Sequence, residues 1–272
     1  MRDAECTAFL QSALPQLGRS WPGYRKVRGL VCKRLARRLR SLGLADLDAY
    51  RRHLATHAEE WRHLDALCGV PISRFYRDRG VFDALERLVL PALAGAAIAQ
   101  PRITLDCWSA GCASGEEPYS LAILWTLRLQ PRFPHLGLRI VATDLDERLL
   151  ARARAGRYAA SSLKELPEEL RIAGLEPADG EWRVRDRFRR AAFRHQDLRE
   201  AMPEGPFDLV LCRNVVLTYY APPVDLEVMQ RIADRLQPGG ALVVGIHESL
   251  PEGLAGFAPW PGARAIHRRA TD

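Results

Sequence analysis

The stretch Leu105-Asp-Cys-Trp-Ser-Ala-Gly-Cys-Ala-Ser-Gly-Glu-Glu-Pro-Tyr-Ser120 decides the fold of this chain. An apolar run at 103–105 leads into a turn of small residues, and apolar residues at helical spacing follow from Glu116 onward. A strand, a glycine turn and a helix in this order are expected to present free backbone N–H groups at the start of the helix. A nucleotide-like ligand can approach the backbone closely at such a turn.

The turn differs from the dinucleotide fingerprint G-x-G-x-x-G, because Gly111 and Gly115 stand four positions apart. Glu116 and Glu117 follow where a pyrophosphate would lie, and their charge would repel it. The sequence therefore favours a cofactor with hydroxyl groups and a positive charge, such as S-adenosylmethionine, over NAD or ATP.

The composition is that of an ordinary globular protein. The chain has 272 residues, enough for one large domain or two of ordinary size. An apolar content of 47% and a charged content of 27% are typical of a soluble protein. The N-terminal sequence lacks the pattern of a signal peptide, and no apolar run approaches the roughly 20 residues of a membrane span. We therefore expect a cytoplasmic protein without membrane insertion.

The six cysteines form no C-x-x-C pair and no spacing typical of zinc ligands. Scattered cysteines in a chain without a signal peptide are typical of a reducing compartment. We therefore expect no metal site, and cysteines that are reduced and mostly buried.

The net charge of +7 comes mostly from arginine and reflects either a genome that prefers Arg to Lys or a partner with an acidic surface. No acidic residue occurs between Glu5 and Asp46, and the segment 24–44 carries a helical apolar stripe at positions 27, 30, 31, 35, 39 and 42. The opposite face carries Lys26, Lys33, Arg37 and Arg40, with Arg34 and Arg38 beside them. This face is either simply solvated or a docking surface. Nucleic acid is not expected as a partner, because no aromatic residues are interleaved with the charges.

The later part of the chain alternates between strand and helix patterns. Strands are expected at 138–143, 207–211 and 240–246, and helices at 116–129, 147–155 and 223–236. Asp146 is expected to cap the helix that begins at Glu147. This alternation predicts an α/β fold with a mostly parallel sheet and helices on both faces. Short strand-like pieces at 181–185 and 190–194 interrupt it.

Five segments, in this order, resemble the CheR family of methyltransferases, which esterify chemoreceptor glutamates. They are Ile72–Asp78, the glycine-turn stretch quoted above, Ala142–Asp146, Phe207–Val215 and Pro238–Gly245. Together with the helical N-terminus, the resemblance covers roughly residues 20–250. It implies a Rossmann-like class I methyltransferase sheet in residues 79–272, a small helical N-terminal domain with its linker in residues 1–78, and a small inserted β subdomain at 157–195.

The resemblance also implies the cofactor and the partner. The cofactor would be S-adenosyl-L-methionine, with S-adenosyl-L-homocysteine as its product. The methyl acceptor would be an acidic protein, since family members present a basic helix to chemoreceptor helices. Six arginines between 183 and 194 would suit an acidic receptor tail, or they are the outward positions of a small sheet. We expect a monomer.

Several acidic residues match cofactor contacts of the family. Asp144 ends the second strand, at the edge of the sheet where ligands bind, and matches the residue that binds the ribose. Gly111 and Glu117 would hold the methionine part. Asp197 and Leu198 match an Asn-Leu pair at the adenine, where the Asp keeps an acceptor for the adenine amino group.

Further matches lie in the segment between the two predicted domains and after the third strand. Ser73 keeps the hydroxyl of a family Thr, and Arg77 falls on an arginine that is important for function. Arg77 is therefore a candidate for both cofactor binding and catalysis. Arg213 and Asn214 match a cofactor or substrate contact, and a buried ion pair is the alternative for Arg213.

Two positions depart from the family pattern. Pro71 stands where the family has Asn, which removes one expected hydrogen bond to the cofactor. Thr218 occupies the place of a family Tyr near the transferred methyl when the segments are aligned without a gap. A shift of one residue would return Tyr219 to that place, so Tyr219 is the second catalytic candidate.

The expected mechanism follows from charge. Methyl transfer from a sulfonium is an in-line displacement, so the enzyme must align the two partners and exclude water. A glutamate with a pKa of about 4.3 is already an anion at neutral pH and needs no general base. Arg77 would position this carboxylate by charge-assisted hydrogen bonds. His247 is either a base for a hydroxyl or amine acceptor or a structural residue.

Two alternatives to glutamate methylation stay open. One is an enzyme of the same fold that acts on another protein or on a small molecule. The other is a regulatory module that binds the cofactor without turnover. A base-labile methyl ester, which releases methanol, would support glutamate methylation over these alternatives.

Overall fold

The computed structural model describes residues 2–271, which form two compact units. The helical unit runs up to Val70 and takes up a second segment, Val215–Asp225. The sheet unit comprises Pro71–Asn214 and the chain from Leu226 onward. No feature of the sequence pattern had indicated the second segment of the helical unit. Within residues 2–271, no helix combines the length and the apolar character that a membrane crossing requires.

The helical unit is built from short helices around one apolar core. They are α1 (Asp3–Ala13), η1 (Leu14–Leu17), α2 (Trp21–Tyr24), α3 (Arg28–Ser41), α4 (Leu47–Thr56), α5 (Ala58–Leu67) and, from the second segment, α11 (Val216–Tyr219). In α3 the predicted apolar stripe is buried at Val31, Leu35 and Leu39, whereas Leu30 is exposed. The helical N-terminal part that the sequence predicted is therefore present.

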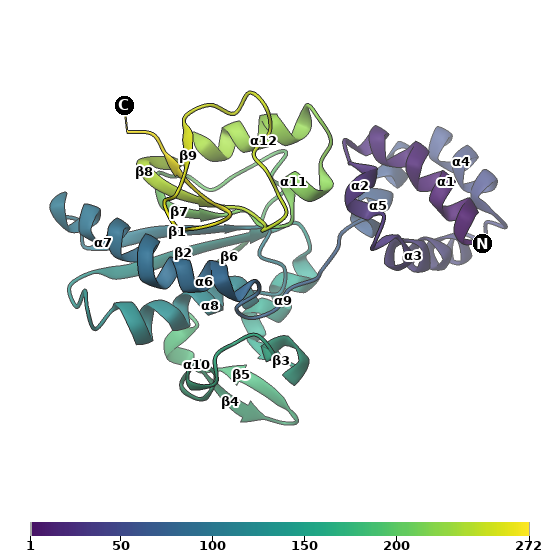
Figure 1. Cartoon of the computed structure of the whole chain (residues 1–272). Coiled ribbons are helices and arrows are strands. Elements are labelled where there is room, and N and C mark those ends of the chain that lie inside the picture. The colour runs from purple at the N-terminus through teal and green to yellow at the C-terminus, as the bar shows by residue number, and fades with distance from the viewer. Residues whose placement is uncertain (1, 272) are drawn as a thin grey trace. The chain divides into compact units, whose positions relative to one another are not determined.

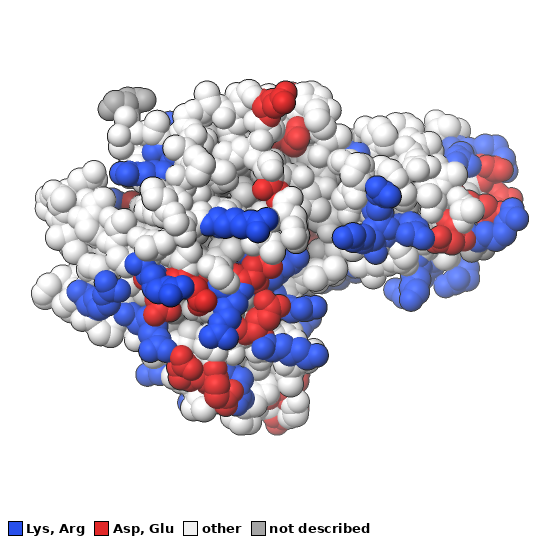
Figure 2. Space-filling model, in the orientation of Figure 1, with Lys and Arg blue, Asp and Glu red and all other residues white. Residues whose placement is uncertain are grey.

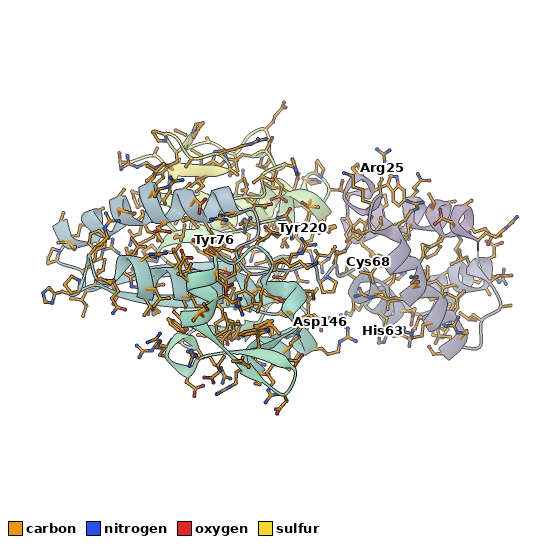
Figure 3. The ribbon with its side chains drawn as sticks, turned by 60° about the horizontal axis from the view of Figure 1, so that its bottom comes forward. Arg25, His63, Cys68, Tyr76, Asp146 and Tyr220 are labelled. Atoms are coloured by element: carbon orange, nitrogen blue, oxygen red, sulfur yellow. A yellow bond between two sulfur atoms is a disulfide. The ribbon has the colours of Figure 1, made fainter. Side chains whose placement is uncertain are left out.

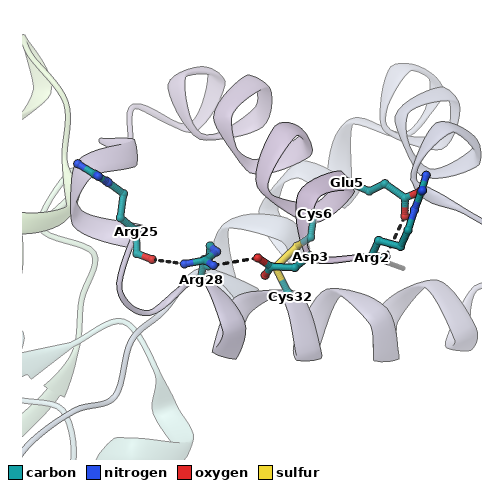
Figure 4. The surroundings of a disulfide bond; sticks show 7 residues. All are labelled: Arg2, Asp3, Glu5, Cys6, Arg25, Arg28 and Cys32. Carbon is teal, nitrogen blue, oxygen red and sulfur yellow. Dashed lines mark hydrogen bonds and ion pairs between the residues drawn. A yellow bond between two sulfur atoms is a disulfide. The ribbon is translucent and has the colours of Figure 1, made fainter.

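A disulfide joins Cys6 of α1 to Cys32 of α3, with Cα atoms 6.0 Å apart (Figure 4). The expectation of reduced thiols is wrong for this pair. The packing of two helices brings positions 26 apart in sequence into bonding distance, and no local spacing rule can anticipate such a contact. The remaining cysteines, Cys68, Cys107, Cys112 and Cys212, are buried and free.

The sheet unit contains a seven-stranded sheet in the order β6-β2-β1-β7-β8-β10-β9. The strands are β1 (Thr104–Ala110), β2 (Gly137–Asp144), β6 (Ala192–His195), β7 (Phe207–Leu211), β8 (Leu236–Val243), β9 (Phe257–Pro259) and β10 (Ile266–Arg269). The first five pair in parallel, and β10 pairs antiparallel with β8 and β9. The predicted α/β fold with a mostly parallel sheet is therefore confirmed. The first strand is longer than the apolar run at 103–105 and reaches Ala110.

Helices cover both faces of this sheet (Figure 1). The helices of the sheet unit are α6 (Arg79–Ala84), η2 (Leu85–Val89), α7 (Leu90–Ala99), α8 (Glu116–Leu124), η3 (Trp125–Leu129), α9 (Glu147–Ala155), η4 (Ala160–Leu163), α10 (Glu168–Gly174), η5 (Asp186–Phe188) and α12 (Val224–Ala233). The first residues of α12 belong to the helical unit. Figure 1 shows α6, α7 and α8 along one side of the sheet and α12 on the other. The predicted helix at 147–155 is confirmed as α9, and the predicted helix at 116–129 is α8 continued by η3.

A second sheet has three antiparallel strands in the order β3-β5-β4, made by β3 (Arg157–Tyr158), β4 (Leu175–Ala178) and β5 (Glu181–Val184). The predicted inserted subdomain at 157–195 thus requires one correction. Its last strand-like piece forms β6, which pairs with β2 at the edge of the large sheet, from Val141↔Ala192 to Asp144↔His195. Strand partners depend on the tertiary fold, so periodicity located the strand without locating its sheet.

Candidate functional site at the ends of the parallel strands

The glycine turn after β1 is hydrogen-bonded to the end of β2. The N–H groups of Gly111 and Cys112 both donate to the carbonyl oxygen of Thr143, at 2.8 and 2.9 Å. The N–H of Ala113 donates to Oδ2 of Asp144 at 2.7 Å. These three N–H groups fix the turn against the neighbouring strand and are not free for a ligand. The expectation of free N–H groups at the start of α8 concerns Glu116 onward and stays a prediction.

Gly115 shows why this turn needs glycine. Its φ is +90°, and a Cβ atom there would lie 2.8 Å from the Cβ of Ala153 and 3.1 Å from the hydroxyl of Tyr158. Any side chain would thus be both strained and obstructed. The close approach lets α8 start directly against α9 and the inserted segment.

Asp144 lies at the end of β2 and uses both carboxylate oxygens within the protein. Oδ2 accepts the N–H of Ala113, and Oδ1 accepts the N–H of Asp146 at 2.9 Å. Burial raises the pKa of Asp144, although these two hydrogen bonds work in the opposite direction. Asp146, labelled in Figure 3, caps α9 by accepting the N–H of Arg148, as predicted. Each carboxylate oxygen has a second lone pair, so Asp144 can still accept from ribose hydroxyls.

Arg213 forms a buried ion-pair cluster just beyond the end of β7. Its side chain is 2% exposed and contacts two carboxylates, Asp78 at 2.7 Å and Glu117 at 3.1 Å. It also donates to the backbone carbonyl of Arg77 at 2.9 Å. Oε1 of Glu117 accepts the hydroxyl of Ser109 at 2.8 Å. The buried ion pair considered for Arg213 is therefore present, and a contact with the cofactor stays a prediction for Arg213 and Glu117.

Arg77 is held between two residues in left-handed conformations, Tyr76 at φ +58° and Asp78 at φ +60°. The N–H of Tyr76 donates to Oγ of Ser120 at 2.9 Å, and Tyr76 is buried within the sheet unit (Figure 3). The Arg77 guanidinium donates to the carbonyl of Ile72 at 2.9 Å and is only half-buried. The backbone of Arg77 is thus fixed while its charged group keeps access to solvent.

The remaining expected contacts are placed as follows. Ser73 is half-buried, Leu198 is buried, and Asp197 forms an ion pair with Arg199 at 2.6 Å. Asn214 lies in a left-handed conformation, with φ +55°. The cofactor contacts of these four residues stay predictions.

Tyr219 and Thr218 belong to the helical unit. The Tyr219 ring packs against the Tyr24 ring, with centroids 5.0 Å apart. The backbone carbonyl of Tyr219 accepts the N–H of Ser20 at 2.9 Å. A Cβ atom at Gly23 would lie 1.9 Å from the carbonyl oxygen of Thr218, so α2 closes directly on α11. The catalytic role of Tyr219 stays a prediction.

Two residues of the site had no signal in the motif analysis. Glu248 accepts the N–H of Asn214 at 2.9 Å and that of Gly245 at 2.6 Å. The N–H of Gln196 donates to the carbonyl of Asp144 at 3.1 Å, which places Gln196 at the end of β2. Glu248 lies beyond the last of the five resembling segments, which ends at Gly245, and Gln196 follows a strand that the sequence pattern places in the inserted subdomain.

The residues present fit an adenosyl cofactor. Nδ2 of Asn214 and Oε1 of Gln196 are buried and have no hydrogen-bond partner among residues 2–271. A buried donor or acceptor without a partner is costly, so a polar ligand that satisfies both groups would be stabilised. Asp144 adds acceptor capacity for hydroxyls at the same strand ends, and the N–H groups of Gly111, Cys112 and Ala113 are already engaged within the protein. This chemistry matches S-adenosylmethionine better than a dinucleotide.

Comparisons with known proteins agree with this geometry. The family model described as CheR methyltransferase, SAM binding domain, matches residues 72–263, and the model described as CheR methyltransferase, all-alpha domain, matches residues 26–65. A chemotaxis protein methyltransferase of Listeria innocua is 37% identical over 201 residues, which are 73% of each chain. A probable chemotaxis protein methyltransferase of Rhizobium etli is 34% identical over 80% of this chain and 83% of its own.

A likeness to solved structures is weaker. The N-methyltransferase NodS from Bradyrhizobium japonicum, in complex with S-adenosyl-L-homocysteine, is 17% identical over 63% of this chain and 62% of its own, with a TM-score of 0.33. At this score the likeness carries no argument about function. The family matches therefore decide the assignment.

Proposed function

Because the chain belongs to the CheR methyltransferase family and is an S-adenosylmethionine-dependent enzyme, we propose that it methylates glutamate carboxylates of a chemoreceptor-like protein to methyl esters. The observation that carries the proposal is the basic face of α3, taken together with relatives named as chemotaxis methyltransferases. A cytoplasmic location is part of this proposal.

The charges on α3 fall into two groups. Arg38 is used internally, because it forms an ion pair with Glu60 at 2.5 Å, and Arg34 donates to the carbonyl of Leu67 at 3.1 Å. Lys33, Arg37 and Arg40 are exposed, and none of them forms an ion pair with any residue in the described part of the chain. Figure 2 shows basic side chains where α3 lies in Figure 1. These three residues, the α3 basic face, supply a positive surface that an acidic helix would complement.

For this reaction the protein mainly has to align the acceptor carboxylate with the methyl group and exclude water. S-adenosylmethionine, when bound, supplies a methyl group on a positively charged sulfur. A glutamate acceptor is already ionised at neutral pH, so the protein needs no base to activate it. Arg77 would hold the acceptor carboxylate, because its guanidinium keeps access to solvent while its backbone is fixed by Arg213. Ser73, Gly111, Asp197, Leu198 and Asn214 would complete the cofactor contacts.

The direct test is transfer of labelled methyl from S-adenosylmethionine into membrane and soluble fractions of the host. We expect label in a receptor-sized membrane protein, released as methanol by alkali. Label that resists alkali would contradict a carboxyl ester, and alkali-labile label only in a small molecule would contradict a protein acceptor. Replacement of Thr218 by Tyr serves as a comparison, because Thr218 stands at the place of the family Tyr when the segments are aligned without a gap.

A charge-reversal variant tests the partner. Replacing Lys33, Arg37 and Arg40 with Glu should raise KM for the protein acceptor and leave kcat nearly unchanged, since these residues bind rather than react. The effect should shrink as salt rises, because exposed charges are screened beyond about 8–10 Å. Reversal of Arg264, an exposed arginine of the sheet unit, is the matched control. Unchanged kinetics in the triple variant would favour the second candidate, a small-molecule acceptor, which the departures at Pro71 and Thr218 keep open.

A further inference from the structure

Glu248 links the ends of two central strands beyond the last hydrogen bond of their ladder. That last bond joins the N–H of Cys212 to the carbonyl of Val243 at 2.9 Å. Past it, Oε2 of Glu248 accepts the N–H of Asn214 at 2.9 Å and the N–H of Gly245 at 2.6 Å. One carboxylate oxygen therefore continues the connection between β7 and β8 at the edge where the cofactor site lies.

The connection leaves no room for variation at Gly245. A Cβ atom there would lie 2.8 Å from Oε2 of Glu248 and 3.0 Å from Oδ1 of Asn214. The contact under 3 Å would force the Glu248 carboxylate to move, and two backbone N–H groups hold that carboxylate in place. Gly245 thus allows the Glu248 carboxylate and the Asn214 amide to approach the same point of the backbone.

Asn214 is the residue that this arrangement constrains. Its φ of +55° lies in the left-handed region, which Asn adopts more readily than most non-glycine residues, and Glu248 holds its backbone N–H there. Its side-chain Nδ2 is buried without a hydrogen-bond partner among residues 2–271. A donor kept buried and unsatisfied on a backbone that is held in place points to a ligand that completes it.

We propose that Glu248 is a positioning residue of the cofactor site. By holding the backbone N–H groups of Asn214 and Gly245, it keeps Asn214 in its left-handed conformation, so that the Asn214 amide donates a hydrogen bond to an oxygen or nitrogen acceptor of S-adenosylmethionine. The inference rests on cofactor binding alone, and it does not depend on which acceptor receives the methyl group.

A double-mutant cycle on cofactor affinity tests this role. Glu248→Ala removes the carboxylate, and Asn214→Gly removes the amide without adding strain at a positive φ. Affinity for S-adenosylhomocysteine is measured by calorimetry in the full chain. We expect each single variant to bind about tenfold more weakly, as for loss of one hydrogen bond to a buried group. In the Asn214→Gly background, Glu248→Ala should add less than about a twofold further loss, because no amide is left to position.

The controls separate positioning from a structural role. Glu252→Ala removes an exposed carboxylate of the same segment and should leave the affinity unchanged. Glu248→Gln keeps an oxygen acceptor of the same length and should recover part of the affinity. If Glu248→Ala does not fold, the cycle is run with Glu248→Gln, whose smaller loss should again vanish without Asn214. A loss that is equal with and without the Asn214 side chain would overturn the proposal, as would full affinity in Glu248→Ala.

The result is independent of the proposed function. If the chain methylates no glutamate, the cycle still reports on cofactor binding, whereas an additive cycle with intact ester formation would overturn only the role of Glu248.

Discussion

Replacing Arg213 with Met is expected to destabilise the sheet unit strongly, because it leaves two partly buried carboxylates without their positively charged partner. The Arg213 side chain is 2% exposed, while Glu117 and Asp78 are 15% and 22% exposed. Met fills a similar volume but makes none of the three contacts that the guanidinium makes to these carboxylates and to the carbonyl of Arg77. The loss therefore reflects charge and hydrogen bonding rather than a cavity.

The magnitude follows from the burial of the partners. Removing one member of a buried ion pair costs about 3–5 kcal/mol, because the remaining charge is left without compensation. Glu117 and Asp78 keep some access to water and can be partly hydrated, so we expect a loss of about 3 kcal/mol in the free energy of unfolding. Neutralising them as well, with Glu117→Gln and Asp78→Asn, should recover about half of this loss.

Urea denaturation followed by circular dichroism measures both values by linear extrapolation. Arg264→Met, at an exposed arginine of the same unit, is the matched control and should change stability by less than about 0.5 kcal/mol. A loss below about 1 kcal/mol in Arg213→Met, or a further loss on neutralising the two carboxylates, would refute the reasoning.

Four further predictions concern the cofactor site and the helical unit. Asp144→Ala should weaken binding of S-adenosylmethionine and S-adenosylhomocysteine about ten- to a hundredfold, and unchanged affinity by calorimetry would contradict the ribose contact. Arg77→Ala should lower kcat far more than cofactor affinity; equal losses would limit Arg77 to holding the cofactor. Replacing both Cys6 and Cys32 with Ser should lower the free energy of unfolding by about 3–4 kcal/mol, given their separation of 26 residues, and reduction of the wild type should reproduce the loss. Burial raises the pKa of Glu60, but hydrogen bonds from Arg38 and Tyr50 outweigh it, so the net pKa is lowered. The stability that Glu60 contributes above the unfolded pKa of about 4.3 should therefore be lost as the pH falls through the lower native pKa. If the melting temperature of a Glu60→Gln variant falls between pH 7 and 3 by as much as that of the wild type, this prediction is wrong.

The elements that sequence reasoning located well are those whose signal is local. The helix Glu147–Ala155 begins at a capping Asp146, and the strand Phe207–Leu211 is a short apolar run, so both could be bounded from their own residues. The pattern predicts a strand at 190–194 in the inserted subdomain, whereas the structure has β6 at Ala192–His195, paired with β2, which lies far away in sequence. The Cys6–Cys32 disulfide was missed for the same reason.

The site shows a different limit. Besides Gly111 and Gly115, four residues that are not glycine adopt left-handed conformations here, namely Tyr76, Asp78, Ala113 and Asn214, and sequence patterns do not mark such positions. In each of them the backbone N–H donates to a side-chain oxygen. The acceptors are Ser120, Glu165, Asp144 and Glu248, respectively.

Acidic residues of this site therefore hold the backbone, whatever else they contact. Matching motifs to a family assigns Asp144 to the ribose, but its Oδ2 also fixes Ala113 at φ +48°. A loss of affinity in Asp144→Ala can arise from either role. Ala113→Gly separates them, because glycine adopts a positive φ without help. If the ribose contact exists, affinity stays low when both substitutions are combined; if Asp144 acts only on the turn, the second substitution restores it.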